Sequence, residues 1–328
     1  MVKKVPVINI ASYIDGSDKQ SVVDQVAAAC RDVGFLVVSG HGIPPETISR
    51  AVAATQQFFA LPLDEKQKYR QPNPDVFRGY FGLAKQALAH STGDTAAPAD
   101  LREAFIFNRI HMDLADPYYQ TELAKKLFPD NIWPDEAAAP GFRAVFSEYY
   151  QAMEALSTTL MRIFALALDL PERWFDDKID KHFTNCSAYY YPPLQQAPQP
   201  NQLRGGAHSD FGSLTIVHGH PSIDGLQVWD GQDWQDAPVE PGTFVVNLGD
   251  LMAYWTNDRW VSTLHRVVVP PESEWDRDRI SLVFFHQPNY DARIECIESC
   301  TDVDHPVKYE PTTSGEHLFR KLRAMHVD

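Results

Sequence analysis

Two hydrophobic patterns divide the chain, and they predict helices in its first half and short strands in its second. Apolar residues recur every three or four positions over residues 142–166, which is typical of one buried face of a long helix. From residue 186 onward, short β-branched and aromatic runs alternate with turn residues: SAYYY, SLTIVHG, GLQVW, TFVVNLGD, STLHRVVV and RISLVFF. Repeated short strands of this kind predict a sandwich or jelly roll.

The N-terminal part alternates strand and helix signals. β-Branched runs at residues 5–10 and 35–38 predict two short strands. Between them, Ser17-x-x-Gln20 has the pattern of a capping box, and Gly34 stands where a helix C-cap belongs. We therefore expect a strand, a helix and a second strand in this order.

Other segments complete the expected order of elements. A pair of prolines predicts the start of a helix over residues 44–59. Residues 71–110 contain prolines and glycines without a sustained period, so we expect a loop-rich segment that forms part of a pocket wall. The Pro/Gln-rich residues 192–202 should join two strands, and a capping box predicts a closing helix over 313–326.

These elements predict one compact domain over residues 1–328. We expect it to be mainly β with packed helices. Its core is a jelly roll over residues 186–311, and helices of the N-terminal region 1–110 and the long central helix buttress that core.

Composition and charge narrow the classes of partner. The 328 residues are 44% hydrophobic, and 29 Lys and Arg against 44 Asp and Glu give a net charge of −15. Such a charge disfavours nucleic acid and membrane surfaces as partners, and neither a signal peptide nor a membrane span is expected. The cysteines are scattered, which favours a reducing, cytoplasmic location; they are Cys30, Cys186, Cys296 and Cys300.

An H-x-D motif occurs three times, and by itself it is weak evidence for a metal site. Residues i and i+2 of a strand point to the same face, so the side chains of His208 and Asp210 should converge. The same spacing occurs at residues 111–113 and 326–328, outside the β-rich region. Only His208 and Asp210 continue into a strand pattern, which favours them as metal ligands.

His265, in the predicted strand STLHRVVV, is the candidate third ligand. Two His and one carboxylate on one face of a metal leave about three coordination positions open, as in non-haem Fe(II) oxygenases. A structural zinc site would be closed by four protein ligands, and Cys296-x3-Cys300 has no matching partners. The pair His218 and His220 is a weaker competitor, because a turn signal follows it directly.

A candidate carboxylate-binding pair opens the strand after His265. The intervening PPESEWDRD predicts the loop of an antiparallel hairpin, which would bring Arg279 and Ser281 back beside His265. A guanidinium and a hydroxyl on one strand face suit a carboxylate ligand. The competing interpretation is an exposed Arg279 that pairs with Asp276 or Asp278.

Together these residues resemble the isopenicillin N synthase-like branch of the 2-oxoglutarate- and Fe(II)-dependent dioxygenases, over nearly the whole chain. The N-terminal segments that carry the resemblance are VPVINIASY, ACRDVGFLVVSGHGIP and FFALPLDEKQKY. The later segments are YYYPP, HSDFGSLTIV, DGLQVWDGQDW, NLGDLMAYWTNDRWVSTLHRVV and RISLVFFHQPN. The resemblance implies a distorted jelly roll, the double-stranded β-helix, with helices outside it.

The resemblance also implies roles for individual residues. It implies an Fe(II) site on His208, Asp210 and His265. It implies that the distal carboxylate of 2-oxoglutarate is bound by Arg279, Ser281 and Tyr191. From pattern alone, the tyrosines of this strand are as readily core residues. Many plant members have Asn where this chain has Tyr189, so a co-substrate contact from that position is not carried over.

The implied activity is oxidation of a small molecule by O2, with release of succinate and CO2 from 2-oxoglutarate. Hydroxylation is the expected outcome, with desaturation or ring closure as variants, and ascorbate is a useful additive. One alternative is an isopenicillin N synthase-type oxidase that uses no 2-oxoglutarate; another is a non-catalytic, metal-loaded small-molecule binder. The sequence does not disclose the substrate or the oligomeric state. Five aromatic residues are candidates for a pocket lining, with core packing as the competing interpretation: Phe81, Phe105, Phe107, Phe211 and Phe285.

Overall fold

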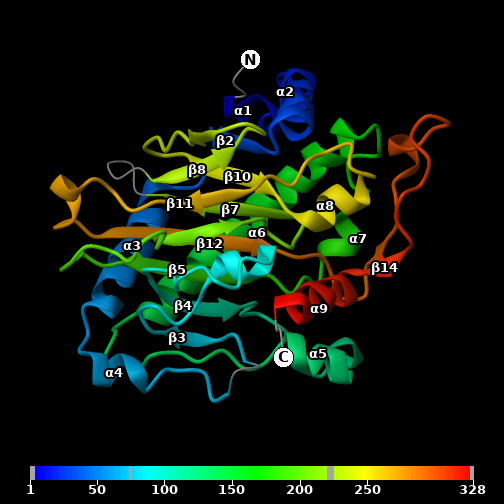
Figure 1. Cartoon of the computed structure of the whole chain (residues 1–328). Coiled ribbons are helices and arrows are strands. Elements are labelled where there is room, and N and C mark those ends of the chain that lie inside the picture. The colour runs from blue at the N-terminus through cyan, green and yellow to red at the C-terminus, as the bar shows by residue number, and fades with distance from the viewer. Residues whose placement is uncertain (1–3, 74–75, 220–224, 326–328) are drawn as a thin grey trace.

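Two β-sheets that face each other form the centre of the computed structural model, which describes residues 4–73, 76–219 and 225–325 (Figure 1). Within these residues the large sheet has eight strands, in the order β1 (Val7–Asn9), β2 (Phe35–Ser39), β10 (Phe244–Leu248), β7 (Leu214–His218), β12 (Arg279–His286), β5 (Asn185–Tyr191), β4 (Glu103–Asn108) and β3 (Gly79–Phe81). The described strands of the small sheet are β6 (Gly205–His208), β11 (His265–Val267), β8 (Leu226–Trp229) and β9 (Trp234–Asp236).

Alternate residues along the strands of the large sheet pack into two different hydrophobic cores, one on each face of the sheet. In β2, Leu36 packs outward with the helices, whereas Val37 packs inward with residues of the small sheet. In β12, Leu282 and Val283 divide in the same way. Because successive side chains of a strand point to opposite faces, the sheet is buried on both sides and encloses an interior toward the small sheet.

Helices cover the outer face of the large sheet (Figure 1). Those that pack on one another there are α2 (Lys19–Asp32), α3 (Pro45–Phe59) and α6 (Phe142–Ala167). In α6, Phe146, Met153 and Leu160 are fully buried at seven-residue spacing, which confirms the predicted long helix. The mainly β jelly roll with packed helices is confirmed as well.

The remaining elements are short. The other α-helices are α1 (Ala11–Ile14), α4 (Leu63–Gln67), α5 (Glu122–Leu127), α7 (Asp176–Ile179), α8 (Asp250–Trp255) and α9 (Ser314–Met325). The 3-10 turns are η1 (Leu88–Thr92), η2 (Pro117–Gln120), η3 (Glu272–Glu274) and η4 (Glu298–Cys300), and a two-stranded ribbon consists of β13 (Arg293–Ile294) and β14 (Thr312–Thr313).

The prediction that residues 71–110 are loop-rich is wrong in part. Strands β3 and β4 lie in this segment and extend the large sheet beyond β5. Every residue of β4 is buried, including Glu103, whose carboxylate pairs with Lys66 at 2.8 Å. A strand buried on both faces has no alternating pattern, so periodicity could not reveal it.

The predicted capping box at the start of α2 is displaced by one residue. Asp18, not Ser17, is the N-cap, and its side chain accepts a hydrogen bond from the backbone N–H of Ser21 at 3.1 Å. The predicted role of Gly34 at the C-terminal end of the helix is confirmed, since its φ is +71°. A β-carbon there would lie 2.2 Å from the carbonyl oxygen of Val261, so glycine is required by space as well as by conformation.

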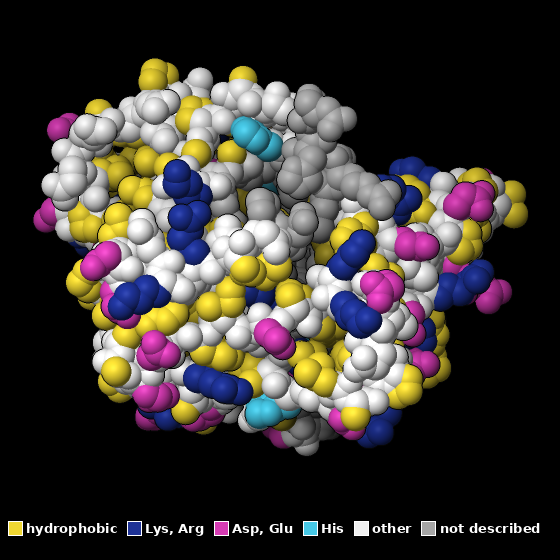
Figure 2. Space-filling model, turned by 90° about the horizontal axis from the view of Figure 1, so that it is seen from below, with side chains coloured by type: hydrophobic (Ala, Val, Ile, Leu, Met, Phe, Trp, Pro, Cys, Tyr) yellow, Lys and Arg dark blue, Asp and Glu magenta, His cyan; other side chains and the backbone are white. Residues whose placement is uncertain are grey.

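The described helices and the charges on one face bear on the predicted absence of a membrane span. Within the described residues, every helix is too short or too polar to cross one. On the face seen in Figure 2, Lys and Arg side chains are interspersed with Asp and Glu side chains rather than gathered in one patch. The cysteines are unpaired.

Candidate active site

Strand register brings three of the predicted ligands together. In the antiparallel pair β6 and β11, His265 lies directly opposite His208, and Asp210 follows β6 by two residues. One Asp210 oxygen, Oδ1, lies 3.6 Å from Nε2 of His208 and 3.9 Å from Nε2 of His265. Ligand atoms from the three buried side chains all lie within 4.8 Å of one another. This is the His-Asp-His cluster predicted from the sequence.

The other ring nitrogen of each histidine fixes its tautomer. Nδ1 of His208 lies 2.8 Å from the carbonyl oxygen of Gly206, and Nδ1 of His265 lies 3.2 Å from that of Thr263. A carbonyl oxygen can only accept, so both Nδ1 atoms carry a proton. Both Nε2 lone pairs therefore point toward the shared centre, as metal ligation requires.

Two residues that sequence analysis did not single out orient Asp210. Its Oδ2 accepts hydrogen bonds from the Thr215 hydroxyl at 2.6 Å and from the Asn247 amide at 2.7 Å. These residues face each other across β7 and β10. The bonds occupy Oδ2 and leave Oδ1 directed at the histidines. An amide inside the apolar run VVNL was the available signal for Asn247.

The protonation states suit a metal ligand set. Burial, and then the neighbouring His265, lower the pKa of His208 to about 3. Burial alone would raise the pKa of Asp210, but the two histidines and the bonds from Asn247 and Thr215 hold it below its usual range. A neutral imidazole and a carboxylate place no proton between the converging atoms, and nitrogen and oxygen donors of this kind fit Fe(II).

A close backbone approach holds the segment that carries Asp210. The Asp250 N–H donates to the carbonyl oxygen of Asp210 at 2.7 Å, and the Gly249 N–H donates to that of Ser213 at 3.1 Å. A β-carbon on Gly249 would lie 2.2 Å from the carbonyl oxygen of Gly212. Glycine at this position therefore lets the two backbones touch.

We expect Gly249→Ala to lower Fe(II) affinity by about tenfold or more and to reduce stability by about 1–3 kcal/mol, because relieving the clash must displace the Asp210 segment. Equilibrium dialysis of Fe(II) under nitrogen and chemical unfolding measure the two effects. Gly82→Ala is the matched control, since its β-carbon would meet only ordinary contacts of 3.6 Å or more. Unchanged Fe(II) affinity in Gly249→Ala would contradict the positioning role of this contact.

The pair predicted to bind a carboxylate lies on the inner face of the large sheet. Arg279 is opposite Tyr191 and Ser281 is opposite Tyr189 in the β12–β5 register. Arg279 is 2% exposed, donates from Nη1 to the Ser281 hydroxyl at 2.6 Å, and stands 4.9 Å from the centre of the Tyr191 ring.

The predicted hairpin between the strands of His265 and Arg279 is wrong. Strand β11 pairs with β6 and β8 of the small sheet, whereas β12 pairs with β5 and β7 of the large sheet. The chain crosses between the sheets after β11, so Arg279 faces the interior from the opposite sheet. Arg279 forms no ion pair with Asp276 or Asp278, two described residues, which disfavours the surface interpretation.

The structure separates the other candidates from this site. Residues 111–113 lie in an irregular segment and are not part of the cluster found among the described residues. His218 ends β7, where its ring lies 5.9 Å from Phe244. His220 and residues 326–328 lie outside the described residues. Of the five aromatic candidates, Phe105 and Phe107 belong to the outer core, Phe81 and Phe285 pack in the inner cluster, and Phe211 lies 6.0 Å from the Lys321 ammonium.

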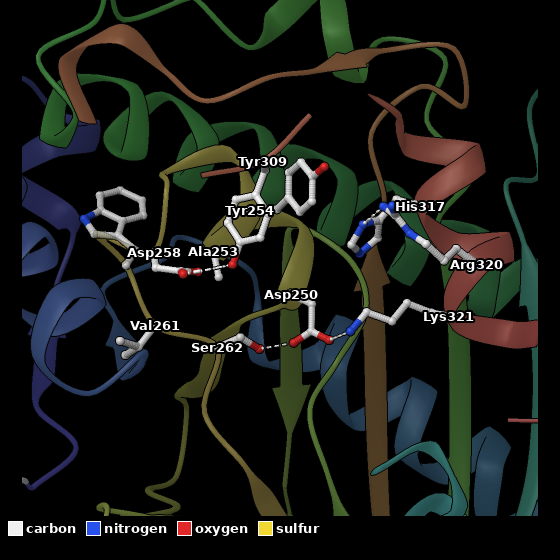
Figure 3. A pocket seen from close by; sticks show the side chains of 11 residues that line it. Asp250, Ala253, Tyr254, Asp258, Val261, Ser262, Tyr309, His317, Arg320 and Lys321 are labelled. Atoms are coloured by element: carbon white, nitrogen blue, oxygen red, sulfur yellow. Dashed lines mark hydrogen bonds and ion pairs between the residues drawn. The ribbon is translucent and has the colours of Figure 1, made fainter. Parts of the chain in front are cut away.

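A cavity of about 610 Å3 lies behind the ligand-bearing segment, between α8 and α9 (Figure 3). Asp250 on its wall accepts hydrogen bonds from Ser262 at 2.7 Å and Ser209 at 3.3 Å, and it pairs with Lys321 at 2.6 Å. Ser209 lies between His208 and Asp210 in sequence. The cavity therefore adjoins the His-Asp-His cluster without being lined by it.

We expect stability to depend on pH through His317, which lines this cavity and is 3% exposed. Burial, and then Lys321 and Arg320, lower its pKa to about 4, while Asp250 opposes this. The unfolded chain, with an ordinary pKa near 6.5, binds the proton first. The free energy of unfolding should therefore fall as pH drops from about 6.5 to about 4, and this contribution should be constant at higher pH.

Denaturant unfolding at several pH values measures this effect in the wild type and in His317→Gln. The difference between their pH profiles isolates the contribution of His317. Identical slopes between pH 6.5 and 4 in the two proteins would contradict the prediction.

Comparisons with known proteins agree with this geometry. Residues 5–136 match the family model "non-haem dioxygenase in morphine synthesis N-terminal". Residues 183–288 match the model of the 2OG-Fe(II) oxygenase superfamily. A homoarginine-6-hydroxylase of Oryza sativa is 32% identical, with 98% of this chain and 97% of the relative covered. Validamycin A dioxygenase of Streptomyces hygroscopicus is also 32% identical, over 100% of this chain and 88% of the relative.

A solved structure is similar over the whole fold. A full-length Neurospora crassa protein, crystallised in complex with alpha-KG and thymine, superposes with a TM-score of 0.85 at 26% identity, covering 98% of this chain and 97% of that one. The likeness therefore includes both the N-terminal part and the β core.

Proposed function

Since the chain belongs to the 2OG-Fe(II) oxygenase superfamily and is a 2-oxoglutarate- and Fe(II)-dependent dioxygenase, we propose that His208, Asp210 and His265 hold its iron. The observation that carries this proposal is the convergence of two Nε2 atoms and one carboxylate oxygen, with the ligand atoms within 4.8 Å of one another. Three ligands on one side leave positions for the co-substrate and O2.

We propose that Arg279, Ser281 and Tyr191 bind the distal carboxylate of 2-oxoglutarate. Arg279 and Ser281 share one inner face with Tyr191, and the buried Nε of Arg279 has no hydrogen-bond partner among the described residues. A planar guanidinium fork suits a carboxylate, which would satisfy its free donors.

When bound, iron, 2-oxoglutarate and O2 supply the oxidative chemistry: one oxygen atom enters succinate, CO2 is released, and the substrate is oxidised, with hydroxylation as the proposed outcome. The chain contributes orientation. Thr215 and Asn247 direct Asp210 toward the metal position, and the Gly206 and Thr263 carbonyls hold the imidazoles in the ligating tautomer. Phe35, packed edge-on against His265 at 5.3 Å, limits access of water.

Finer assignments are proposals of the same kind. We place the chain in the isopenicillin N synthase-like branch, on the sequence segments that resemble it, and we retain 2-oxoglutarate as co-substrate because the relatives are named for it. We propose that residues 1–328 act as one unit, since β1 to β4 of the N-terminal part join the large sheet. Unpaired cysteines support a cytoplasmic location.

A substrate screen that measures succinate tests the proposed function. We expect succinate release to require Fe(II), 2-oxoglutarate and O2, to increase in the presence of ascorbate and to rise further with a matching small molecule. Zn(II) should inhibit, because it can occupy the same ligands without redox chemistry. Product formation with Zn(II) under strict anaerobiosis would contradict an oxygenase mechanism.

A further inference from the structure

Three buried arginines lie around the C-terminal end of β5, near Tyr189 and Tyr191. Each has an N–H donor that no neighbouring acceptor in the described part of the chain uses. Arg102, Arg204 and Arg279 are 6%, 1% and 2% exposed. The Nε of each has no hydrogen-bond partner among the described residues. A guanidinium stays charged at any physiological pH, so a buried one with free donors calls for an anionic ligand.

The proposed function accounts for one of the three. Arg279 receives the distal carboxylate of 2-oxoglutarate, and the other carboxylate of that molecule belongs to the metal. Arg204 lies close behind, with Nη2 at 3.4 Å from the carbonyl oxygens of Pro192 and Arg277 and its guanidinium 6.0 Å from the Tyr191 ring. Arg102 is left without a ligand.

Arg102 lies on the inner face of the large sheet. It directly precedes β4, where Glu103 is opposite Tyr190 and Ala104 is opposite Tyr189. The inner face shared by Ala104 and Tyr189 therefore continues to Arg102. Its guanidinium lies 4.1 Å from the centre of the Tyr189 ring.

Arg102 is also close to the strand that carries His208. Its ion-pair partner Asp100 accepts a hydrogen bond from the Gly206 N–H of β6, which ends at His208. The Tyr191 side chain is within hydrogen-bonding reach of the guanidinium, but a neutral phenol does not compensate a buried charge. The guanidinium is thus placed where a molecule bound next to the metal would meet it.

The nearest carboxylate does not satisfy Arg102. Asp100 forms a buried ion pair with Nη2 of Arg102 at 3.7 Å, but this distance is too long for a direct hydrogen bond. Both Asp100 oxygens are already used, since Oδ1 accepts from the Gly206 N–H at 2.8 Å and Oδ2 from the Leu88 N–H at 3.1 Å. Asp100 therefore ties η1 to β6 and leaves the donors of Arg102 available.

A structural arginine in the same chain has a different environment. Arg78 is 3% exposed, and its Nε also has no partner among the described residues, but its two terminal nitrogens donate to the Phe77 carbonyl, to the Asn185 side chain at 3.0 Å and to the Leu127 carbonyl at 3.0 Å. Those bonds join separate segments. Within the described part of the chain Arg102 makes no comparable set of bonds, so joining segments does not explain its burial.

We propose that Arg102 binds a carboxylate of the main substrate, so that the enzyme acts on organic acids, amino acids included. This inference rests on the proposed function, because it assumes the metal on the His-Asp-His cluster and 2-oxoglutarate on Arg279. Arg102 is a specificity-determining residue in this scheme. Its planar fork, whose Nε makes no protein bond, receives the carboxylate and turns the rest of the substrate toward the metal.

Pairs of acids and their primary amides test the inference. The probes are hexanoate and hexanamide, phenylacetate and phenylacetamide, and L-homoarginine and L-homoargininamide. Their affinities are measured by calorimetry under nitrogen, on protein loaded with Fe(II) and 2-oxoglutarate, where no turnover occurs. We expect at least one acid to bind the wild type roughly ten- to hundredfold more tightly than its amide, as a charge-assisted hydrogen bond predicts.

Arg102→Met should abolish the preference for acids while 2-oxoglutarate affinity stays within about threefold. Arg102→Lys, which keeps the charge beside Asp100, should retain part of the preference. The matched control is Arg109→Met: Arg109 lies 3.6 Å from Glu154, also has an Nε without a hydrogen-bond partner, and packs outside the barrel against α6. This control should keep the preference.

The outcomes separate this inference from the proposed function. If no acid binds the wild type more tightly than its amide, or if Arg102→Met keeps the preference, the inference is overturned. Loss of 2-oxoglutarate affinity in Arg102→Met would also overturn it, by making Arg102 a co-substrate residue. Failure of the wild type to bind 2-oxoglutarate in an Fe(II)-dependent manner would instead overturn the proposed function.

Discussion

Replacing His208, Asp210 or His265 with alanine should reduce 2-oxoglutarate turnover to background while the fold is retained. Each residue contributes one of the three converging ligand atoms. Loss of a partner outside the ligand shell alone lowers metal affinity roughly 10–100-fold in metalloproteins, and loss of a ligand atom exceeds this. The cluster joins β6 to β11, which also pair through their backbones, so the metal is not the source of folding energy.

Iron content per chain, succinate release and thermal unfolding measure these effects. His111→Ala and Asp113→Ala are the matched controls, because they carry the same H-x-D spacing outside the cluster. If His111→Ala removes iron and His208→Ala does not, the ligand assignment is wrong.

Arg279→Ala should raise the apparent KM for 2-oxoglutarate by roughly one to two orders of magnitude. A hydrogen bond to a charged group contributes about 1.5–3 kcal/mol, and each 1.4 kcal/mol corresponds to about tenfold. Arg279→Lys should recover only part of the affinity, since a point charge replaces a planar fork that also contacts Ser281. Fe(II) affinity should be unchanged, because Arg279 is not a ligand.

Steady-state kinetics with varied 2-oxoglutarate, and calorimetry under nitrogen, measure the change. Arg162→Ala is a suitable control, since its guanidinium pairs with Asp176 at 2.7 Å away from the cluster. Wild-type dependence on 2-oxoglutarate in Arg279→Ala, together with a raised KM for the main substrate, would assign Arg279 to the substrate. An isopenicillin N synthase-type placement would then be the better account of this arginine.

The predictions that the structure contradicts fail for separate physical reasons. The N-cap of α2 was misplaced by one residue because Ser17 and Asp18 are both good capping residues, and local pattern cannot choose between them. Strand β4 was missed because it is buried on both faces. The hairpin was inferred from chain proximity, whereas β11 and β12 belong to different sheets.

The sequence by itself determined the features that depend on neighbours along the chain. Periodicity predicted α6 and the strands of the jelly roll, and the i, i+2 rule placed Arg279 with Ser281 on one strand face. His208 and Asp210 converge as expected, but Asp210 lies in the turn after β6 and not in the strand. These relations follow from backbone geometry over a few residues, so they hold whatever the sheet order.

Only the tertiary structure decided which distant segments meet. It placed Asn247 on Asp210, let the backbone at Gly249 touch that at Gly212, and brought Arg102 onto the Tyr189 ring. Each contact joins strands or loops that are far apart in sequence. Whether these segments come into contact depends on strand order and on where the chain crosses between the two sheets. Hydrophobic periodicity does not predict either feature.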